Sequence, residues 1–340
     1  MSFRDDLNRV CLLDLPWNEL ESANILITGA TGLIGSVLID VLMLRFDEKC
    51  QVFASGRSEN RLKKRFADYV GRPNFHLIRY DVTEPLESET DFHVIIDAAS
   101  GASPQLYSTD PVGVMRANFL GVDNLLSYGV SHKLKRFLYI SSGEIYGEGG
   151  EEKITEDYSG YVNCASVRAC YPSCKRAAET LCESYARQFG VDVRIARPCH
   201  VYGPNFTETD KRVYAQFIRN VLNNEDIVLK SDGSQFRSWC YVVDCVSALL
   251  YILLKGESGE AYNVADESSN ISIRELAEMV AAIGNKKVVF EIPEILEKEG
   301  FNVVKKSIFS TGKLNELGWA VSGTMKEKMK KTIDEAFLLR

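Results

Sequence analysis

Residues 24–35 read Asn24-Ile-Leu-Ile-Thr-Gly29-Ala-Thr-Gly32-Leu-Ile-Gly35, an apolar run followed by three regularly spaced glycines. The run predicts a buried strand at 24–28, and the apolar residues 33–46 predict a buried helix. Glycines let a pyrophosphate approach the connecting turn, and the helix N-terminus offers unpaired N–H groups. This segment therefore predicts a dinucleotide-binding loop, with contacts from Gly29, Thr31, Gly32, Leu33, Ile34 and Gly35.

Strand and helix signals alternate along the chain after this loop. We expect further strands at residues 51–54, 75–80, 93–97, 137–140 and 191–196. Between them, the sequence pattern predicts helices at residues 60–70, 111–130 and 171–189. Because such alternation builds a parallel sheet with helices on both faces, the sequence predicts an α/β fold of the doubly wound Rossmann type.

The alternation loosens after Pro204, which indicates a second part of the fold. We expect residues 1–22 to form an N-terminal extension and residues 23–197 to form the dinucleotide-binding domain. Residues 198–340 are expected to form mainly a smaller α/β substrate-binding lobe, with parts of 236–265 returning to the first domain. A cleft should then separate the two parts.

The composition excludes several classes of protein. The chain has 340 residues, 45% hydrophobic and 26% charged, as in globular proteins. Its net charge of −7 gives no basic face for nucleic acid. It has no membrane-length apolar stretch and no secretory signal, so we expect a cytoplasmic protein that does not bind membranes. The nine cysteines and four histidines lack metal-ligand spacing, so we expect free thiols and no metal site.

The second expected strand ends in Ser55-Gly56-Arg57-Ser58, without the acid that usually binds the ribose 2′-hydroxyl. Arg57 and Ser58 could instead accommodate a 2′-phosphate. These residues therefore leave the choice between NAD and NADP open, and we expect NAD as the cofactor without excluding NADP. Further cofactor contacts are expected after the other strands and on the helix at 111–130, from Asp81, Val82, Ala98, Ala99, Ser100, Asn118 and Pro198.

A tyrosine and a lysine lie four residues apart in Tyr171-Pro-Ser-Cys-Lys175, on one face of an expected helix. The ammonium should lower the pKa of the phenol, so that Tyr171 can take a proton from a sugar hydroxyl while hydride leaves for the nicotinamide. Ser142 should hydrogen-bond the oxygen being oxidised, and Glu144 should point into the same cleft. The predicted catalytic residues are Tyr171, Lys175, Ser142 and Glu144.

The order of these motifs resembles the extended short-chain dehydrogenases (NAD-dependent epimerases and dehydratases) that act on nucleotide sugars. The resemblance runs from about residue 24 to about residue 254 and looks closest to UDP-glucuronate decarboxylases. It rests on segments such as Ser103-Pro104, Arg168-Ala-Cys-Tyr171 and Gly233-Ser-Gln-Phe-Arg237. It implies that a nucleotide-diphosphate sugar contacts Ser103, Tyr107, Glu144, Arg168, His200, Arg212 and Arg237.

The resemblance also implies a homodimer, in which the helices at 111–130 and 171–189 pack against their copies as a four-helix bundle. Apolar residues on these helices include Val114, Phe119, Leu125, Leu126 and Leu181. The sequence departs from the family at Gly143, where relatives have serine, and at His200, where they have asparagine. We expect Gly143 to leave extra space that a water could fill, and His200 to be a partly buried packing residue.

The resemblance implies oxidation at C4 of the hexose to a transient ketone, followed by decarboxylation of a uronate. A 4,6-dehydratase and a 4-epimerase would share the first step and are the alternatives. Glu144 counts against epimerisation, since such enzymes commonly have threonine there. A non-catalytic dinucleotide sensor on the same fold is a further alternative, against which the intact Ser142, Tyr171 and Lys175 argue.

Overall fold

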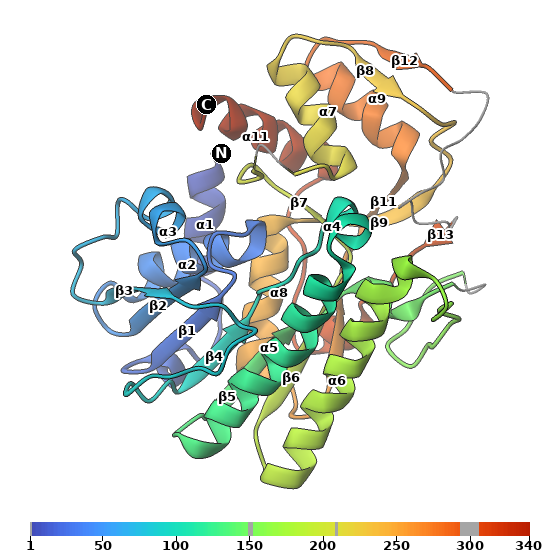
Figure 1. Ribbon diagram of the computed structural model, residues 1–340. Helices are drawn as coiled ribbons and strands as arrows, with labels where there is room; N and C mark the ends of the chain where they lie inside the picture. The colour runs from blue at the N-terminus through green and yellow to red at the C-terminus, as the bar shows by residue number, and fades with distance from the viewer. Residues whose placement is uncertain (1, 149–151, 208–209, 293–305) are drawn as a thin grey trace.

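Seven parallel strands form the central sheet of the computed structural model, which describes residues 2–148, 152–207, 210–292 and 306–340 (Figure 1). The strand order is β10-β6-β5-β4-β1-β2-β3. It confirms the predicted α/β fold of Rossmann type. The strands are β1 (Asn24–Thr28), β2 (Gln51–Gly56), β3 (Phe75–Arg79), β4 (Val94–Asp97), β5 (Arg136–Ile140), β6 (Val193–Pro198) and β10 (Ala261–Val264).

Alternate residues of each strand enter the two faces of this sheet, because successive side chains point to opposite sides. On β1, Ile25 and Ile27 pack in the cluster that contains α2 (Leu33–Phe46) and α8 (Val242–Lys255). Leu26 instead packs in the cluster that contains α5 (Pro111–Ser131) and α6 (Cys170–Phe189), which lie side by side in Figure 1. The short α3 (Glu59–Arg65) joins the first cluster through Leu62.

The first 22 residues pack into the main core. Helix α1 (Phe3–Cys11) starts at a capping box between Ser2 and Asp5 and lies against α2. The following turn of 3₁₀ helix, η1 (Trp17–Leu20), buries Trp17 edge-on against Phe46, with ring centroids 5.7 Å apart. Because α1 covers the outer side of α2, that helix is apolar all round, as its sequence indicates.

A smaller sheet forms around β9 (Phe236–Tyr241), beyond the carboxyl ends of the central strands. β11 (Asp266–Ser272) pairs with it antiparallel, while β7 (His200–Tyr202) and β13 (Lys306–Ser307) pair with it in parallel. Above it in Figure 1 lies a parallel pair of strands with its helices. These are β8 (Ile227–Leu229), β12 (Val288–Phe290), α7 (Val213–Leu222), α9 (Ile273–Ile283) and α11 (Met325–Leu338).

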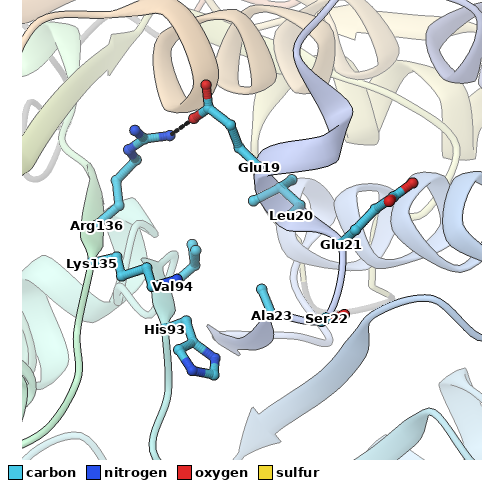
Figure 2. Close-up of a pocket in the computed structure, with 9 residues that line it drawn as sticks. All are labelled: Glu19, Leu20, Glu21, Ser22, Ala23, His93, Val94, Lys135 and Arg136. Atoms are coloured by element: carbon cyan, nitrogen blue, oxygen red, sulfur yellow. Dashed lines mark hydrogen bonds and ion pairs between the residues drawn. The ribbon is translucent and has the colours of Figure 1, made fainter.

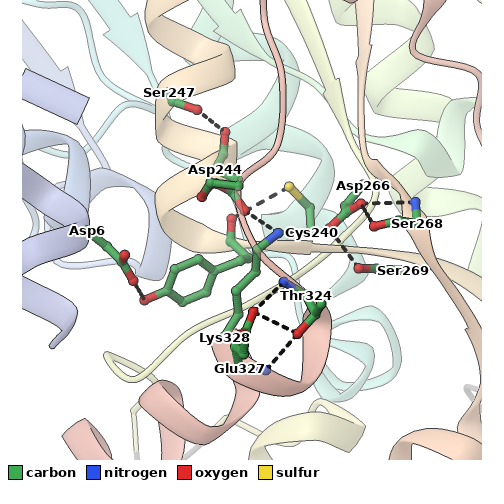
Figure 3. A network of polar contacts seen from close by, with 12 residues as sticks. Asp6, Cys240, Asp244, Ser247, Asp266, Ser268, Ser269, Thr324, Glu327 and Lys328 are labelled. Atoms are coloured by element: carbon green, nitrogen blue, oxygen red, sulfur yellow. Dashed lines mark hydrogen bonds and ion pairs between the residues drawn. The ribbon is translucent and has the colours of Figure 1, made fainter. Parts of the chain in front are cut away.

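A buried ion network connects α1, α8, β11 and α11, and Figure 3 shows its members Asp6, Asp244, Asp266 and Lys328. We use this name for Asp6, Asp244, Asp266, Lys328 and Lys331. The Lys328 ammonium lies 2.7 Å from the Asp244 carboxylate and 2.9 Å from the Asp266 carboxylate. Lys331 lies 2.9 Å from Asp6. Each carboxylate in the network therefore faces an ammonium, as burial of a charge requires.

Short elements complete the chain: α4 (Pro104–Thr109), η2 (Gly143–Tyr146), η3 (Val167–Ala169) and α10 (Gly312–Glu316). Within the described ranges, no helix combines the length and apolar character that a bilayer crossing needs. The same ranges contain no group of three or more side chains suited to hold a metal ion. All nine cysteines are free thiols.

Candidate active site

The glycine loop connects β1 to α2 at the carboxyl edge of the central sheet. Gly29 has a positive φ of 59°, and a Cβ atom there would lie 2.4 Å from the carbonyl oxygen of Ala98. A Cβ on Gly35 would lie 2.7 Å from the carbonyl oxygen of Gly29. Two of the three glycines are thus required by the close packing of this loop on itself and on the end of β4.

Gly32 has a different environment, because it is exposed and is the N-cap of α2. No side chain caps this helix, so its first N–H groups stay available to an anion, beside Thr31, Leu33 and Ile34. A Cβ on Gly32 would meet only the carbonyl oxygen of Gly29, at 3.1 Å. The loop therefore has the shape and the free donors that a dinucleotide pyrophosphate needs.

Thr28 and Asp97 end neighbouring strands and were not expected as site residues. The Thr28 hydroxyl donates to Asp97 at 2.5 Å and accepts from the N–H groups of Ala98 and Ala99, both at 3.2 Å. Burial raises the pKa of Asp97, an effect that Thr28 and the nearby Lys175 oppose. The pair fixes the segment after β4, where the sequence predicts cofactor contacts. Its only signal in the sequence is an acid closing the apolar run Val94-Ile-Ile-Asp97.

Tyr171 and Lys175 both lie buried on α6 and face the ends of β4 and β5. The Lys175 ammonium donates to the carbonyl oxygen of Ile140 at 2.7 Å and lies 5.9 Å from the centre of the Tyr171 ring. Burial raises the pKa of Tyr171, and the Glu144 carboxylate raises it further; the hydroxyls of Ser142 and Ser100 act in the opposite direction. The net shift of the Tyr171 pKa is therefore upward, opposite to the lowering that the sequence predicts, because burial is the largest contribution.

Two serines surround the Tyr171 phenol. The Ser142 oxygen accepts a hydrogen bond from the backbone N–H of Glu144 at 3.1 Å, which leaves its own proton free to donate. The Ser100 hydroxyl donates to Asn118 on α5 at 3.0 Å, and the Asn118 amide donates to the carbonyl oxygen of Val114 at 2.8 Å. The predicted residues Ser100, Asn118, Ser142 and Tyr171 are thus brought together.

Glu144 and Arg168 form an ion pair beside Tyr171. One terminal nitrogen of Arg168 donates to both carboxylate oxygens of Glu144, at 2.8 and 2.9 Å. The guanidinium lies over the ring of Tyr107, 4.6 Å from its centre. Tyr107 in turn stacks on Tyr171 with ring centroids 4.9 Å apart. Three residues predicted from separate segments therefore converge on the tyrosine.

Arg237 and Arg212 form a second cationic group, with the His200 ring beside them. Arg237 is buried on β9, and burial lowers its pKa to about 10, while Glu144 opposes this shift. His200 keeps a face open to solvent, and its ring packs against that of Trp239 with centroids 5.3 Å apart, which is compatible with the predicted packing role. The pKa of His200 is lowered to about 3 by burial in the surrounding protein and by the positive charges of Arg237 and Arg212. The ring is therefore neutral at pH 7. Arg212 pairs with Asp210 at 2.5 Å.

The remaining predicted residues lie along the same edge of the sheet. Ser58 caps α3, and Arg57 beside it is exposed, without an ion-pair partner among the described side chains. Asp81 accepts from the N–H and the hydroxyl of Thr83, at 3.1 and 2.9 Å. Val82 is buried next to Gly121 on α5. Pro198 ends β6, and Ser103 is the half-buried N-cap of α4.

The space beside Gly143 is filled. A Cβ atom on Gly143 would lie 2.5 Å from the Cζ atom of Phe309 and 2.9 Å from its Cε2 atom. The expectation that a water occupies this space is therefore wrong, because an aromatic ring is already there. Phe309 lies 166 positions further along the chain, so no local sequence pattern could have indicated the contact.

A cavity of about 340 Å³ lies at the opposite edge of the sheet (Figure 2). It is next to the amino ends of β1, β4 and β5 and is lined by Glu19, Leu20, Glu21, Ser22, Ala23, His93, Val94, Lys135 and Arg136. Arg136 and Glu19 form an ion pair at 3.0 Å on its wall. Ligands of open parallel sheets bind at the carboxyl ends of the strands, so we do not assign the active site to this cavity.

The chain is similar to known proteins over most of its length. A model of the NAD dependent epimerase/dehydratase family matches residues 25–265. UDP-glucuronic acid decarboxylase 6 of Arabidopsis thaliana is 38% identical over 271 residues, which cover 79% of this chain and 77% of the relative. UDP-glucuronic acid decarboxylase 1 of Xenopus tropicalis is 34% identical over 321 residues, or 93% and 72% of the two chains.

Solved structures share the fold. UDP-glucuronic acid 4-epimerase from Bacillus cereus, in complex with UDP-glucuronic acid and NAD, has a TM-score of 0.79 at 22% identity and covers 93% of this chain and 100% of that one. A dTDP-glucose 4,6-dehydratase from Streptomyces venezuelae also has a TM-score of 0.79 at 22% identity, covering 92% and 96%. With the family match over most of its length, the chain belongs to the NAD dependent epimerase/dehydratase family.

Proposed function

We propose that this protein decarboxylates UDP-glucuronate to UDP-xylose, with NAD bound at the glycine loop. The observation that carries the proposal is the placement of Glu144 against Arg168, within the electrostatic influence of Arg237, directly beside Tyr171. Two arginines that interact with Glu144 suit a substrate with a diphosphate and a carboxylate, because guanidinium binds both groups in a bidentate manner. The similarity to UDP-glucuronic acid decarboxylases supports the same substrate.

In the oxidation step, Tyr171 takes the proton of the C4 hydroxyl while Ser142 donates a hydrogen bond to the same oxygen. Bound NAD supplies the acceptor for the C4 hydride and a positive charge near the tyrosine. That charge and Lys175 are needed because burial raises the pKa of Tyr171. Lys175 is suited to this role because, among the described residues, no carboxylate lies within ion-pair distance of its ammonium.

In the decarboxylation step, the C5–C6 bond breaks and its electron pair moves into the C4 ketone, which becomes an enolate as carbon dioxide leaves. Hydrogen bonds from Ser142 and Tyr171 stabilise the enolate oxygen. Glu144 or Arg237 then delivers the proton to C5, and hydride returns to C4. Burial lowers the pKa of Arg237 to about 10, and the guanidinium still carries its full charge at pH 7.

The test is to incubate the purified protein with a panel of nucleotide sugars and to analyse the products by mass spectrometry. We expect UDP-glucuronate to lose carbon dioxide and give UDP-xylose, with no net consumption of NAD. Loss of water from another sugar would identify a dehydratase, and an unchanged mass with a new sugar configuration would identify an epimerase. Either result without carbon dioxide release would overturn the proposal, and no turnover at all would favour a non-catalytic sensor.

We also propose that the protein is a homodimer through α5 and α6. Of the apolar residues that the sequence suggests, Val114, Leu125 and Leu126 are buried within the chain itself and cannot form an interface. The support comes instead from an exposed apolar stripe on α5, made by Val112, Met115, Phe119 and Leu120. Light scattering at micromolar concentration should give twice the chain mass, and Phe119→Glu should halve it. A monomeric mass for the unaltered protein would contradict the proposal.

For the division of labour, we propose that the central sheet binds NAD and that residues from 198 onward bind most of the nucleotide sugar. Residues 1–22 then belong with the central sheet, since α1 packs on α2.

The nine free thiols support a reducing compartment such as the cytoplasm.

A further inference from the structure

Phe309 presses against the backbone of the segment that carries Ser142 and Glu144. The tightest contact is at Gly143, where a Cβ atom would lie 2.5 Å from Cζ, 2.9 Å from Cε2 and 3.2 Å from Cε1 of the ring. Gly143 is not among the residues with positive φ, so its backbone conformation does not call for glycine. The ring of Phe309 is thus the feature that excludes a side chain at position 143.

The ring has no room to retreat. Phe309 is 1% exposed and packs with Ile145, Tyr146, Ile154 and Ala265. The Tyr146 ring lies 5.5 Å away, and its hydroxyl is held by Asn263 at 2.6 Å. The main chain around Phe309 is fixed as well, because Ser310 N–H donates to the carbonyl oxygen of Ile154 at 2.8 Å. A clash at position 143 must therefore be relieved by movement of the 142–147 segment.

The same residue reaches the second cationic group. The backbone N–H of Phe309 donates to the Ser238 hydroxyl at 3.1 Å, and Ser238 follows Arg237 on β9. One rigid aromatic residue thus spans from the loop of Glu144 to the strand of Arg237. These two side chains interact electrostatically, and both are assigned to the chemistry at C5 in the proposed reaction.

We propose that Phe309 is a positioning residue, which holds Glu144 against Arg168 and at a fixed place relative to Arg237 through its contact with Gly143. It does not touch the reacting atoms. Hydrogen bonds fix the 142–147 segment at several points: Ile145 N–H donates to the Ser142 carbonyl at 3.2 Å, Gly147 N–H to the Glu144 carbonyl at 3.1 Å, and Gly160 N–H to the Tyr146 carbonyl at 3.0 Å. The ring of Phe309 adds side-chain packing to these bonds at Gly143.

The test is a double-mutant cycle with Gly143→Ala and Phe309→Leu. Leucine removes Cε1, Cε2 and Cζ, the three ring atoms that an alanine Cβ would strike. Gly143→Ala alone should reduce kcat by roughly tenfold or more with a smaller change in KM, while Phe309→Leu alone should have a milder effect. In the double variant, kcat should recover to within about threefold of Phe309→Leu. Phe92→Ala, in a buried cluster on the α5 and α6 face, is the control for general loss of stability.

Hydrogen exchange of the peptide spanning 141–148 gives a readout that needs no substrate. Exchange should accelerate in both single variants, slow again in the double variant and stay unchanged in Phe92→Ala. If the two substitutions act independently on exchange, or if exchange shows the coupling and kcat does not, Phe309 is only a core residue and the proposal is overturned. Because part of the role rests on the proposed function, an inactive unaltered protein would refute that function alone, and the exchange cycle would still decide the contact.

Discussion

Two groups of buried charges serve opposite ends in this protein. In the buried ion network, Asp6, Asp244 and Asp266 each face a lysine within 3 Å, across four elements of the chain. At the candidate active site, Lys175 is just as buried, yet its ammonium meets a backbone carbonyl, and Asp97 bonds to a threonine. The paired charges of the network join distant segments. Lys175 and Asp97 are incompletely paired, so a bound ligand can still gain free energy by interacting with them.

The comparison extends to proton affinities. Burial lowers the pKa of Lys175 and raises those of Tyr171 and Asp97, so all three are displaced toward their neutral forms. In the network, the attraction of Asp244 and Asp266 outweighs burial and raises the pKa of Lys328, and hydrogen bonds lower the pKa of Asp266, whereas burial raises the pKa of Asp244. Groups whose pKa values are displaced toward the neutral form are typical of functional sites. Groups whose charge is matched by a partner of opposite charge are typical of structural sites.

The largest effect should follow from Tyr171→Phe. Removing the proposed proton acceptor should reduce turnover by at least about 10³-fold while leaving nucleotide-sugar affinity nearly unchanged, since the ring and its stacking on Tyr107 remain. Stability should change little. Steady-state kinetics and calorimetric binding measure the two quantities. Tyr185→Phe, on the same helix but bonded to Asp123, is the control and should retain full rate. A near-normal rate in Tyr171→Phe would remove the tyrosine from the mechanism.

Among substitutions in the buried ion network, Lys328→Met should have the largest effect on stability. It leaves Asp244 and Asp266 buried without their shared cation, which should lower the free energy of unfolding by about 3–5 kcal/mol. Urea denaturation measures this loss. The control is Lys330→Met on the same helix, whose exposed pair with Asp334 should be worth less than about 1 kcal/mol. Equal losses of unfolding free energy in the two variants would show that the buried ion network contributes no more to stability than an exposed ion pair.

Regular elements were predictable where the sequence pattern was local. The strand at 24–28 and the helix at 33–46 have the bounds that the sequence predicts, because an apolar run bordered by glycine or polar residues defines each of them. The predicted helix at 111–130 is one residue short. In contrast, β9 and β11 lie in the smaller sheet, and their residues 236–241 and 266–272 are not recognisable as strands, since their pairing partners lie far away in sequence.

The candidate site was predictable where its residues lie close together in the sequence, as were the regular elements. Tyr171 and Lys175 share one helix, so spacing alone places them together. Arg168 is expected from the sequence to bind substrate, and nothing in the sequence indicates its pairing with Glu144. Phe309 could not be predicted, because it acts through a contact with a distant glycine. Asp97 could not be predicted either, because its sequence context is that of an ordinary strand end.

His200 should give the smallest effect, and it tests whether the two neighbouring arginines disfavour a further positive charge at the site. The pKa of its ring is lowered to about 3 by surrounding protein and by Arg237 and Arg212, against about 6.5 in the unfolded chain. The unfolded chain therefore binds more protons, and stability should fall as the pH drops below about 6.5. Because the ring keeps an open face, we expect only about 1 kcal/mol at pH 5. Denaturation of the unaltered protein and His200→Asn at pH 7 and pH 5 measures this difference. The variant should lose less stability on acidification, and an identical loss in both proteins would mean that His200 can take up a proton freely beside two arginines.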